Sequence, residues 1–359
     1  MSSPSTSDVV IAGAGIIGLS LGLELRRRGF SVIVLERYRA MRAASWAAGG
    51  MLAARDPENP PVLLPLSLRS LTLYPAYLDH IQITSRELVP LRTQRTLQQN
   101  SESAASSVDE VLSREAVFQE AQSSIPGLVD TGKEFNWLDE QSLDPRDLCR
   151  ALPAAFVAEK GTLLEETSAL SIEKSGSGLV VRTARGDIHA GTFVNCCGAW
   201  AGESRLSRLP VEPVKGQAVT ISLAPERLRC VLRTPEFYAI PRGDGRVTIG
   251  ATIEHVGFNE TVEPHRIAAL LRTVSRLLPE VSDSSHLETW AGLRPGTPDG
   301  LPILSAAEME NCWHATGHYR NGVLLAPVTA QLISQAICGE SPDLPMENFS
   351  LSRFAPIMG

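Results

Sequence analysis

The feature that most constrains the fold is the stretch DVVIAGAGIIGLSLGLELRRRGFSVIVLER near the N-terminus, residues 8 to 37. A short apolar run leads into the glycines of a G-x-G-x-x-G pattern, which are Gly13, Gly15 and Gly18. A helical run follows and ends at Gly29, and a second β-branched run ends in Glu36. The glycines alone would fit any glycine-rich turn, but strand, turn, helix, strand and acid in this order predict a dinucleotide-binding β-α-β unit.

The residues of this unit have separate mechanical uses. Gly13 permits a tight turn, Gly15 lets the backbone approach a pyrophosphate, and Gly18 lets helix and strand pack closely. The carboxylate of Glu36 suits a ribose 2′-hydroxyl group. The candidate cofactor-binding residues of the unit are Gly13, Gly15, Ile16, Ile17, Gly18, Glu36 and Arg37.

The next segment, AASWAAGGMLAA at residues 43 to 54, is small, flexible and nearly uncharged. Small residues let a backbone lie against a flat ring. An extended FAD has to pass from the sheet towards a second site along such a segment, whereas NAD does not require it. A short Ala-Gly helix packed in the core is the alternative interpretation. The candidate FAD-binding residues here are Ala44, Ser45, Gly49, Gly50 and Met51.

Length and composition limit the remaining possibilities. A chain of 359 residues exceeds the size at which a single core usually divides, so two domains are expected. Hydrophobic residues make up 43% and charged residues 20%, which is typical of a globular enzyme. The net charge is −7 and no dense basic block occurs beyond the arginines at 26 to 28, so we expect no nucleic-acid partner.

Cysteine and histidine usage points to no metal site. The six cysteines show no C-x-x-C spacing and the seven histidines are scattered, which predicts reduced thiols in a cytoplasmic protein. The N-terminal MSSPSTSD is polar, and the apolar stretch behind it is interrupted by glycines. These features indicate neither a signal peptide nor a membrane span, and we expect no membrane partner.

The middle of the chain predicts a helix followed by many strands. The helix covers residues 143 to 161, and strands are expected within 162–174, 178–184 and 192–200. Between 211 and 290, strand-like runs surround the turn RGDGR, which predicts an antiparallel module. A polar loop at 98–107 is expected to lead into a helix with a Ser107/Glu110 capping box.

These patterns predict an α/β fold, in which a Rossmann-like FAD-binding domain carries an inserted α+β substrate domain with an antiparallel sheet. The predicted FAD-binding domain is discontinuous and comprises residues 1–84, 139–209 and 291–359. The predicted substrate domain comprises residues 85–138 and 210–290.

Two C-terminal stretches carry further candidates. In GHYRNGVLLAP, residues 317 to 327, we expect a positive φ at Gly322 and a helix that has Pro327 in its first turn and ends at Gly339. Either this is an ordinary loop and helix, or the helix start faces an electron-rich group. In WAGLRPGTPDG, Arg294 lies among apolar residues and requires an anionic partner, either a ligand or a structural carboxylate.

The chain resembles the FAD-dependent amine oxidases of the D-amino acid oxidase family, and within it the glycine oxidases of thiamine biosynthesis. The motifs that carry the resemblance, in chain order, are IAGAGIIG, SWAAGGMLAA, NCCGAWA, PVKGQ, YAIPR, GATI, AGLRPGTPDG and GHYRNGVLLAPVT. The segment from about 55 to 135 matches poorly.

The resemblance implies roles for residues at matching positions. Arg294 would hold the substrate carboxylate at two points, Tyr238 would hydrogen-bond the same group, and Arg320 would line the site beside the flavin. These three are the catalytic candidates. The remaining cofactor candidates are Ala169, Gly198, His318, Tyr319, Asn321, Gly322, Val323 and Leu324, and residues 318 to 324 would run along the isoalloxazine ring. Because AGLRPGTPDG contains no cysteine, we expect non-covalent FAD.

The implied activity is oxidative deamination of glycine, sarcosine or a small D-amino acid, with hydride transfer to the flavin, an imine or oxo acid as product, and hydrogen peroxide from oxygen. Glu236 and Ile253 depart from the histidine and methionine that similar glycine oxidases carry, which leaves the choice among these substrates open. A D-amino acid dehydrogenase with another electron acceptor and a non-catalytic flavin-binding protein are the alternatives. We also expect a homo-oligomer.

Overall fold

A mixed β-sheet built from distant parts of the chain carries the glycine-rich turn. The computed structural model describes residues 6–100, 113–203, 206 and 208–357. In this sheet β1 (Thr6–Ala12) lies between β2 (Val32–Leu35) and β10 (Gly186–Asn195), parallel to both. The sheet continues through β7 (Thr162–Leu164), β17 (Cys312–Thr316) and β16 (Ile303–Ala306), and β10 also pairs with the hairpin β8 (Ala169–Ser175) and β9 (Gly178–Thr183). The central strands are continuous apolar runs because both of their faces are buried.

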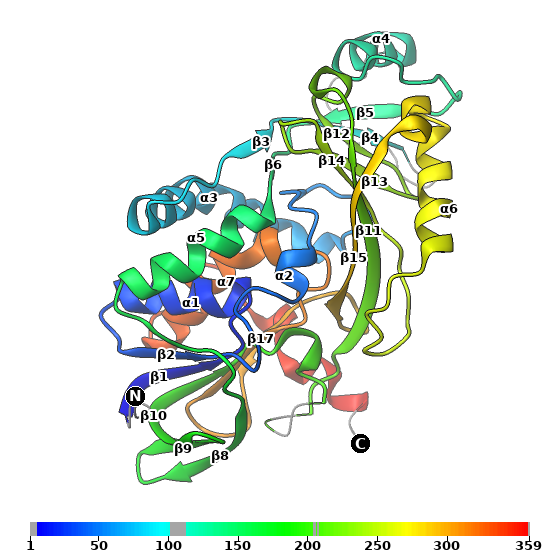
Figure 1. The fold of residues 1–359 in the computed structure, drawn as a ribbon. Helices are drawn as coiled ribbons and strands as arrows, with labels where there is room; N and C mark the ends of the chain where they lie inside the picture. Colours follow the sequence, from blue (N-terminus) through cyan, green and yellow to red (C-terminus); the bar gives the residue numbers. More distant parts are fainter. Residues whose placement is uncertain (1–5, 101–112, 204–205, 207, 358–359) are drawn as a thin grey trace.

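Helices cover one face of this sheet (Figure 1). They are α1 (Ile16–Arg27), α5 (Pro145–Ala158) and α7 (Gly322–Ile337), and a fourth helix, α3 (Leu64–Ser85), packs on α5 and α7. The first and the last of them, α1 and α7, lie side by side although they are about 300 residues apart in a chain of 359. All four helices contribute to one apolar core with the sheet, so the N- and C-terminal parts of the chain fold as one unit.

A second sheet, antiparallel except for the parallel pair of its β12 and β4 strands, forms the other half of the molecule. Its order is β15 (Ser285–Gly296), β11 (Glu212–Ser222), β14 (Arg246–Gly250), β13 (Tyr238–Pro241), β12 (Val231–Arg233), β4 (Thr96–Gln99) and β5 (Phe135–Leu138). Helix α6 (Pro264–Ser275) covers its outer face, and α4 (Arg114–Ser124) lies at its end (Figure 1). A separate apolar core fills the space between this sheet and α6, and the opposite face is free to line a ligand site.

Two short elements lie between the halves: α2 (Ala44–Ala47) contacts α5 and β15, and the 3₁₀ turn η2 (Gly198–Trp200) contacts β11 and β15. A separate two-stranded sheet is formed by β3 (Leu91–Thr93) and β6 (Ser142–Leu143). The other 3₁₀ turns are η1 (Pro61–Leu63), η3 (Pro225–Arg227), η4 (Pro279–Asp283), η5 (Glu347–Phe349) and η6 (Leu351–Ile357). The predicted fold class is confirmed: a parallel-type sheet and an inserted antiparallel sheet are both present. The predicted domain boundary between residues 290 and 291 falls within β15, which pairs with β11 along its whole length, and the domain bounds stay a prediction.

The sequence predicts a helix near Ser107 and another over residues 143–161. The capping box at Ser107 and Glu110 lies outside the described residues. The helix α4 begins later, at Arg114, where the Ser113 hydroxyl accepts a hydrogen bond from Ala116 N at 3.2 Å. The helix expected over 143–161 is confirmed as α5, and Asp144 caps it.

The start of α7 was predicted wrongly. The helix begins at Gly322, so Pro327 lies inside it instead of in a first turn that starts at the proline. A proline there lacks the N–H that would bond the carbonyl of Val323. The hydroxyl of Tyr74, from α3, donates to that carbonyl instead, and Ser70 donates to the next one, Leu324 O, at 2.6 Å. Tertiary contacts with α3 therefore let the helix extend past the proline.

Candidate active site

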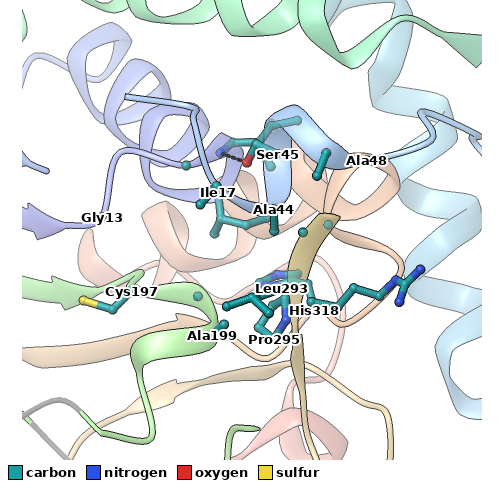
Figure 2. Close-up of a pocket in the computed structure, with 18 of the residues that line it drawn as sticks. Gly13, Ile17, Ala44, Ser45, Ala48, Cys197, Ala199, Leu293, Pro295 and His318 are labelled. Carbon is teal, nitrogen blue, oxygen red and sulfur yellow. Dashed lines mark hydrogen bonds between the residues drawn. The ribbon is translucent and has the colours of Figure 1, made fainter. Parts of the chain in front are cut away.

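A cavity of about 740 Å³ lies between the two sheets. One end is formed by the turn after β1, the other by residues of β13, β15 and the loop before α7. Figure 2 shows Gly13, Ser45 and Ala48 above the cavity and Leu293, Pro295 and His318 below it. The cavity thus joins the glycine-rich turn to the face of the antiparallel sheet.

At the end of the cavity formed by the glycine-rich turn, which we call the glycine end, the backbone is packed so closely that two positions have no space for a side chain. Gly13 has a φ of 105°, and a Cβ there would lie 2.3 Å from the carbonyl oxygen of Cys196. A Cβ on Gly18 would lie 2.0 Å from the carbonyl oxygen of Gly13. Both contacts are far inside van der Waals distance, so only glycine fits at these two positions. The turn brings the N-terminus of α1 to the cavity, and Gly15 places no capping side chain over it.

Two side chains hold this turn in place. The Glu36 carboxylate accepts hydrogen bonds from Ala14 N and Tyr38 N, each at 3.0 Å. The hydroxyl of Ser45 accepts from Ile16 N at 2.9 Å, as the dashed line in Figure 2 shows. The segment expected to be small and flexible therefore folds back onto the turn.

The segment from 43 to 54 forms one short helix and then an extended stretch along the cavity. Gly50 has a φ of 85°, and a Cβ there would lie 2.2 Å from the carbonyl oxygen of Leu143. The small residues Ala44, Ala47, Ala48 and Gly49 line the cavity. The segment therefore contains the short helix of one interpretation, but its small residues line the cavity, as the FAD-binding interpretation expects.

At the other end, Arg294 and Tyr238 meet on the inner face of the antiparallel sheet. Arg294 donates from Nη1 to the carbonyl oxygens of Thr252 at 3.1 Å and Lys215 at 3.4 Å, and its side chain is hydrogen-bonded to that of Tyr238. Burial raises the pKa of Tyr238, and the positive charge of Arg294 opposes this shift. Among the described residues, no carboxylate forms an ion pair with Arg294.

Glycines make room for these two side chains. A Cβ on Gly216 would lie 2.3 Å from the Arg294 guanidinium, and a Cβ on Gly250 would lie 2.4 Å from the Tyr238 hydroxyl. Gly216 belongs to the motif PVKGQ. A glycine within a strand often marks a place where another group comes close to the backbone, and here that group is the Arg294 side chain.

Buried charges behind β11 fix the carbonyl acceptors of Arg294. The ammonium of Lys215 is fully buried and lies 3.4 Å from a carboxylate oxygen of Glu254 and 3.3 Å from one of Glu263. Glu254 also accepts a hydrogen bond from Gln217 at 2.8 Å, and its backbone pairs with that of Lys215. This pairing holds the segment after Gly250 against β11, so the carbonyl of Thr252 is a fixed acceptor.

Arg320 differs from Arg294 in its partners. Its Nη2 lies 3.0 Å from a carboxylate oxygen of Asp56, and its Nη1 is paired with Glu58. The same oxygen of Asp56 lies 3.8 Å from the buried guanidinium of Arg233, which in turn lies 3.0 Å from the carboxylate of Glu140. Arg320 therefore lines the cavity with its charge already compensated.

The loop before α7 carries two buried polar groups. The Nε2 atom of His318 lies 2.9 Å from the Thr329 hydroxyl, and burial lowers the pKa of His318 to about 3, so this histidine is neutral. Asn321 donates to the Asn59 side chain at 2.8 Å. His314 and His318 are four residues apart, but His314 lies within β17, and the described residues include no group of three potential metal ligands.

The expected positive φ at Gly322 is not found. Gly322 is the first residue of α7 with helical geometry, and the positive φ values of this loop are 74° at Gly317 and 46° at Tyr319. Tyr319 is held there because its N–H bonds the carbonyl oxygen of Pro295 at 2.9 Å. A Cβ on Gly322 would meet only the Cβ of His318, at 3.8 Å, so the protein itself does not require glycine there.

The sequence of this chain matches the family described as FAD dependent oxidoreductase (DAO) over residues 8–336. The chain belongs to this family. It is 33% identical to the glycine oxidase of Pseudomonas aeruginosa over 353 residues, which cover 93% of this chain and 95% of that protein. It is 36% identical to the bifunctional protein ThiO/ThiG of Trichormus variabilis, but the match covers 97% of this chain and only 55% of that relative. The chain therefore spans about half the length of the bifunctional relatives it matches.

Solved structures of other proteins agree with the fold. The crystal structure of glycine oxidase from Geobacillus kaustophilus has a TM-score of 0.88 and 28% sequence identity, with 97% of this chain and 99% of that chain covered. The L-proline dehydrogenase of P. horikoshii has a TM-score of 0.85 at 20% identity, which shows the shared fold alone. Within the described residues, none of the helices combines the length and hydropathy needed to cross a bilayer.

The cofactor of this family, FAD, fits the residues of the glycine end. The N-terminus of α1 opens on the cavity, where a diphosphate would meet its positive dipole end and the backbone N–H groups other than that of Ile16, which Ser45 accepts. The N-terminus of α7 opens on the same cavity at its far end, and Asn321 places no side-chain cap on it. An extended dinucleotide can therefore lie between two helix N-termini, with the small residues of 44–50 beside it.

The structure brings nearly all the predicted site residues to one cavity. Those that line it are Gly13, Gly15, Ile16, Ile17, Glu36, Arg37, Ala44, Ser45, Gly49, Gly50, Met51, Ala169, Gly198, Tyr238, Arg294, His318, Tyr319, Arg320, Asn321, Gly322 and Val323. Two predicted residues do not line it. Gly18 packs against Gly13, and Leu324 is buried in the core.

Several lining residues had no clear signal in the sequence. Asp56 lies in the segment that matched the family poorly, and its role depends on Arg320, far away in the chain. Trp200 stacks on Phe258, with ring centroids 5.6 Å apart, and the guanidinium carbon of Arg37 lies 3.8 Å from the centroid of the Trp200 ring. Trp200 stands in the motif NCCGAWA, but nothing near it in the sequence identifies these two partners.

Proposed function

We propose that this protein is an FAD-dependent amine oxidase that oxidises a small amino acid, with glycine as the favoured substrate and sarcosine or a small D-amino acid as alternatives. The observation that carries the proposal is the guanidinium of Arg294. It faces a cavity continuous with the dinucleotide turn and, among the described residues, has only backbone carbonyls and Tyr238 as partners. A substrate carboxylate would supply the missing negative charge.

The residues of the protein hold and orient the substrate. Arg294 binds the carboxylate in two-point fashion and the Tyr238 hydroxyl donates a further hydrogen bond, so the α-carbon is fixed relative to both. Bound FAD supplies the chemistry of hydride acceptance from that α-carbon, with oxygen as the final acceptor and hydrogen peroxide as product. The imine formed from the amino acid hydrolyses to an oxo acid and ammonia or an amine.

The loop before α7 offers the cavity a neutral histidine and backbone N–H groups, since the charge of Arg320 in this loop is already paired with Asp56 and Glu58. His318 is neutral and fixed by Thr329, so it does not compete with the arginines for the substrate carboxylate. The N-terminus of α7 presents free N–H groups and a positive dipole end to the cavity. We propose that residues 318 to 323 would hold the isoalloxazine ring of FAD, where that dipole would favour negative charge on the ring.

An anaerobic substrate panel tests the proposal. The reconstituted protein is mixed with glycine, sarcosine, D-alanine and D-proline, and the flavin absorbance is followed. We expect glycine to bleach the flavin fastest. If none of these amines bleaches it, the protein is a flavin-binding protein without amine turnover.

The acceptor is tested separately. In air, one hydrogen peroxide per imine identifies an oxidase, whereas little peroxide together with reduction of a quinone dye identifies a dehydrogenase. Release of intact FAD on denaturation checks that the flavin is non-covalent. A role in thiamine biosynthesis and a homo-oligomeric state remain predictions. The similarity to proteins named ThiO/ThiG supports the former.

A further inference from the structure

Two arginines, Arg294 and Arg320, line the end of the cavity formed by β13, β15 and the loop before α7, and they differ in their partners. Arg294 has no carboxylate partner among the described residues, whereas Arg320 has two, Asp56 and Glu58. A cavity with two open guanidinium groups would bind a substrate with two carboxylates, because each group pairs with one anion. Among the described residues, this end of the cavity offers one such group, Arg294.

The two carboxylates that cover Arg320 are held in place by their own loop. Glu58 N donates to the Asp56 side chain at 3.0 Å, so the backbone between them is turned tightly. Asn59 donates to the carbonyl oxygen of Ala53 at 3.2 Å and accepts from Asn321 at 2.8 Å. The loop is therefore fastened to the segment that carries Arg320 by a second contact besides the ion pairs.

Asp56 belongs mainly to Arg320. It is nine-tenths buried and lines the cavity, and its distance to Arg320 is 3.0 Å compared with 3.8 Å to Arg233. Arg233 has its own carboxylate, Glu140, at 3.0 Å. Glu140 neither lines the cavity nor pairs with Arg320, so the two arginines are compensated by different acids.

We propose that Asp56 and Glu58 set the substrate class by closing the second anion site of the cavity. This inference rests on the proposed function. A second substrate carboxylate that approached Arg320 would meet two negative charges in a partly buried place, which disfavours it. The enzyme therefore accepts amino acids with one carboxylate and a small neutral substituent and rejects diacids such as iminodiacetate and D-aspartate.

The experiment opens the second site by removing its acids. The variants are Asp56→Asn, Glu58→Gln and the double variant, all as FAD-reconstituted protein. Binding of acetate and of malonate is measured from the change in flavin absorbance. Initial rates are measured with glycine and with iminodiacetate. In the double variant we expect the affinity ratio of malonate to acetate, and the rate ratio of iminodiacetate to glycine, to rise about tenfold or more.

Two controls identify the cause. Glu140→Gln removes a carboxylate from the same charge cluster but not one that contacts Arg320, so both ratios should change less than about twofold. Adding Arg320→Met to the double variant should return both ratios to the parent values. If Asp56→Asn does not fold, Glu58→Gln carries the test alone, because Glu58 is an exposed residue.

The outcomes separate this inference from the proposed function. Unchanged ratios in the double variant overturn the inference even if the parent oxidises glycine. An equal rise with Glu140→Gln also overturns it. If the parent oxidises no amine but malonate binding improves in the double variant and is lost with Arg320→Met, the closed anion site stands and the proposed oxidation fails.

Discussion

The two ends of the cavity are built in different ways. At the glycine end the turn that faces the cavity is built from backbone and small residues of β1, the start of α1 and the segment that follows β2, with larger side chains such as Arg37 and Trp200 around it. At the arginine end the walls are side chains from β13, β15 and the loop before α7, supported by buried charges behind β11. Backbone recognises a feature shared by all dinucleotides, the phosphates, whereas positioned side chains recognise one kind of substrate.

The difference predicts how each end responds to mutation. At the glycine end an added atom should affect cofactor binding and folding together. At the arginine end a lost group should affect turnover while cofactor binding persists.

The largest effect is expected for Gly13→Ala. The added Cβ would lie 2.3 Å from a backbone carbonyl oxygen at a φ of 105°, so the turn has to move. We expect the unfolding free energy to fall by about 4 kcal/mol or more and FAD retention to be lost. Gly29→Ala is the matched control, because Gly29 has a φ of 91° but no neighbour within 4 Å. It should cost only about 1 to 2 kcal/mol and keep FAD, as urea unfolding and FAD titration would show.

Removing the carboxylate-binding guanidinium comes next. Arg294→Ala should lower kcat/KM for glycine by a factor that corresponds to about 3 kcal/mol or more, because a bidentate, charge-assisted contact is lost. FAD should bind as it does in the parent. Near-normal kcat/KM in this variant would disprove the assignment of Arg294.

Tyr238→Phe removes one hydroxyl from the same end. Its loss should cost about 1 to 2 kcal/mol in kcat/KM, less than the loss of Arg294, because one hydrogen bond is removed and the charge remains. Steady-state kinetics with glycine measures the difference. An effect equal to that of Arg294→Ala would mean that Tyr238 does more than hydrogen-bond the carboxylate.

A smaller effect is expected from His318 when the pH falls. Its pKa is about 3 in the folded protein and 6.5 for an ordinary histidine, so the unfolded state binds a proton between these values and the folded state does not. The free energy of unfolding is therefore unaffected by His318 above pH 6.5 and decreases as the pH falls below it, because protonation then favours the unfolded state. Between about pH 7 and 5.5 the loss should be about 1 kcal/mol. His318→Gln should remove that part of the pH dependence in urea unfolding, and an unchanged slope would contradict it.

The smallest effect on folding is expected for Gly322→Val. The residue has helical geometry and a Cβ there would lie 3.8 Å from its nearest neighbour, so the melting temperature of the apoprotein should change by about 2 °C or less. If the flavin ring lies against Gly322, FAD affinity should nevertheless fall about tenfold. FAD binding as tight as in the parent would contradict the proposal that residues 318 to 323 lie beside the flavin ring.

Much of the glycine end could be predicted because its signals are local. The turn at Gly13, the helix α1 and the acid Glu36 follow one another within about 25 residues, and each obeys a rule of backbone geometry. The motifs around Tyr238 and Arg294 were also recognisable, although only as a resemblance. The start of α7 was not predictable, since Tyr74 in α3 is what satisfies the carbonyl that Pro327 leaves free.

The sequence by itself therefore determined the β-α-β unit, the fold class and the candidate residues, because local backbone rules and short motifs encode them. Only the tertiary structure decided which charges remain open. Asp56 and Glu58 neutralise Arg320 from a segment more than 250 residues away, while the partners of Arg294 within the described part of the chain are backbone carbonyls and the Tyr238 hydroxyl. Electrostatic compensation depends on distance in space, and the order of residues along the chain does not specify that distance.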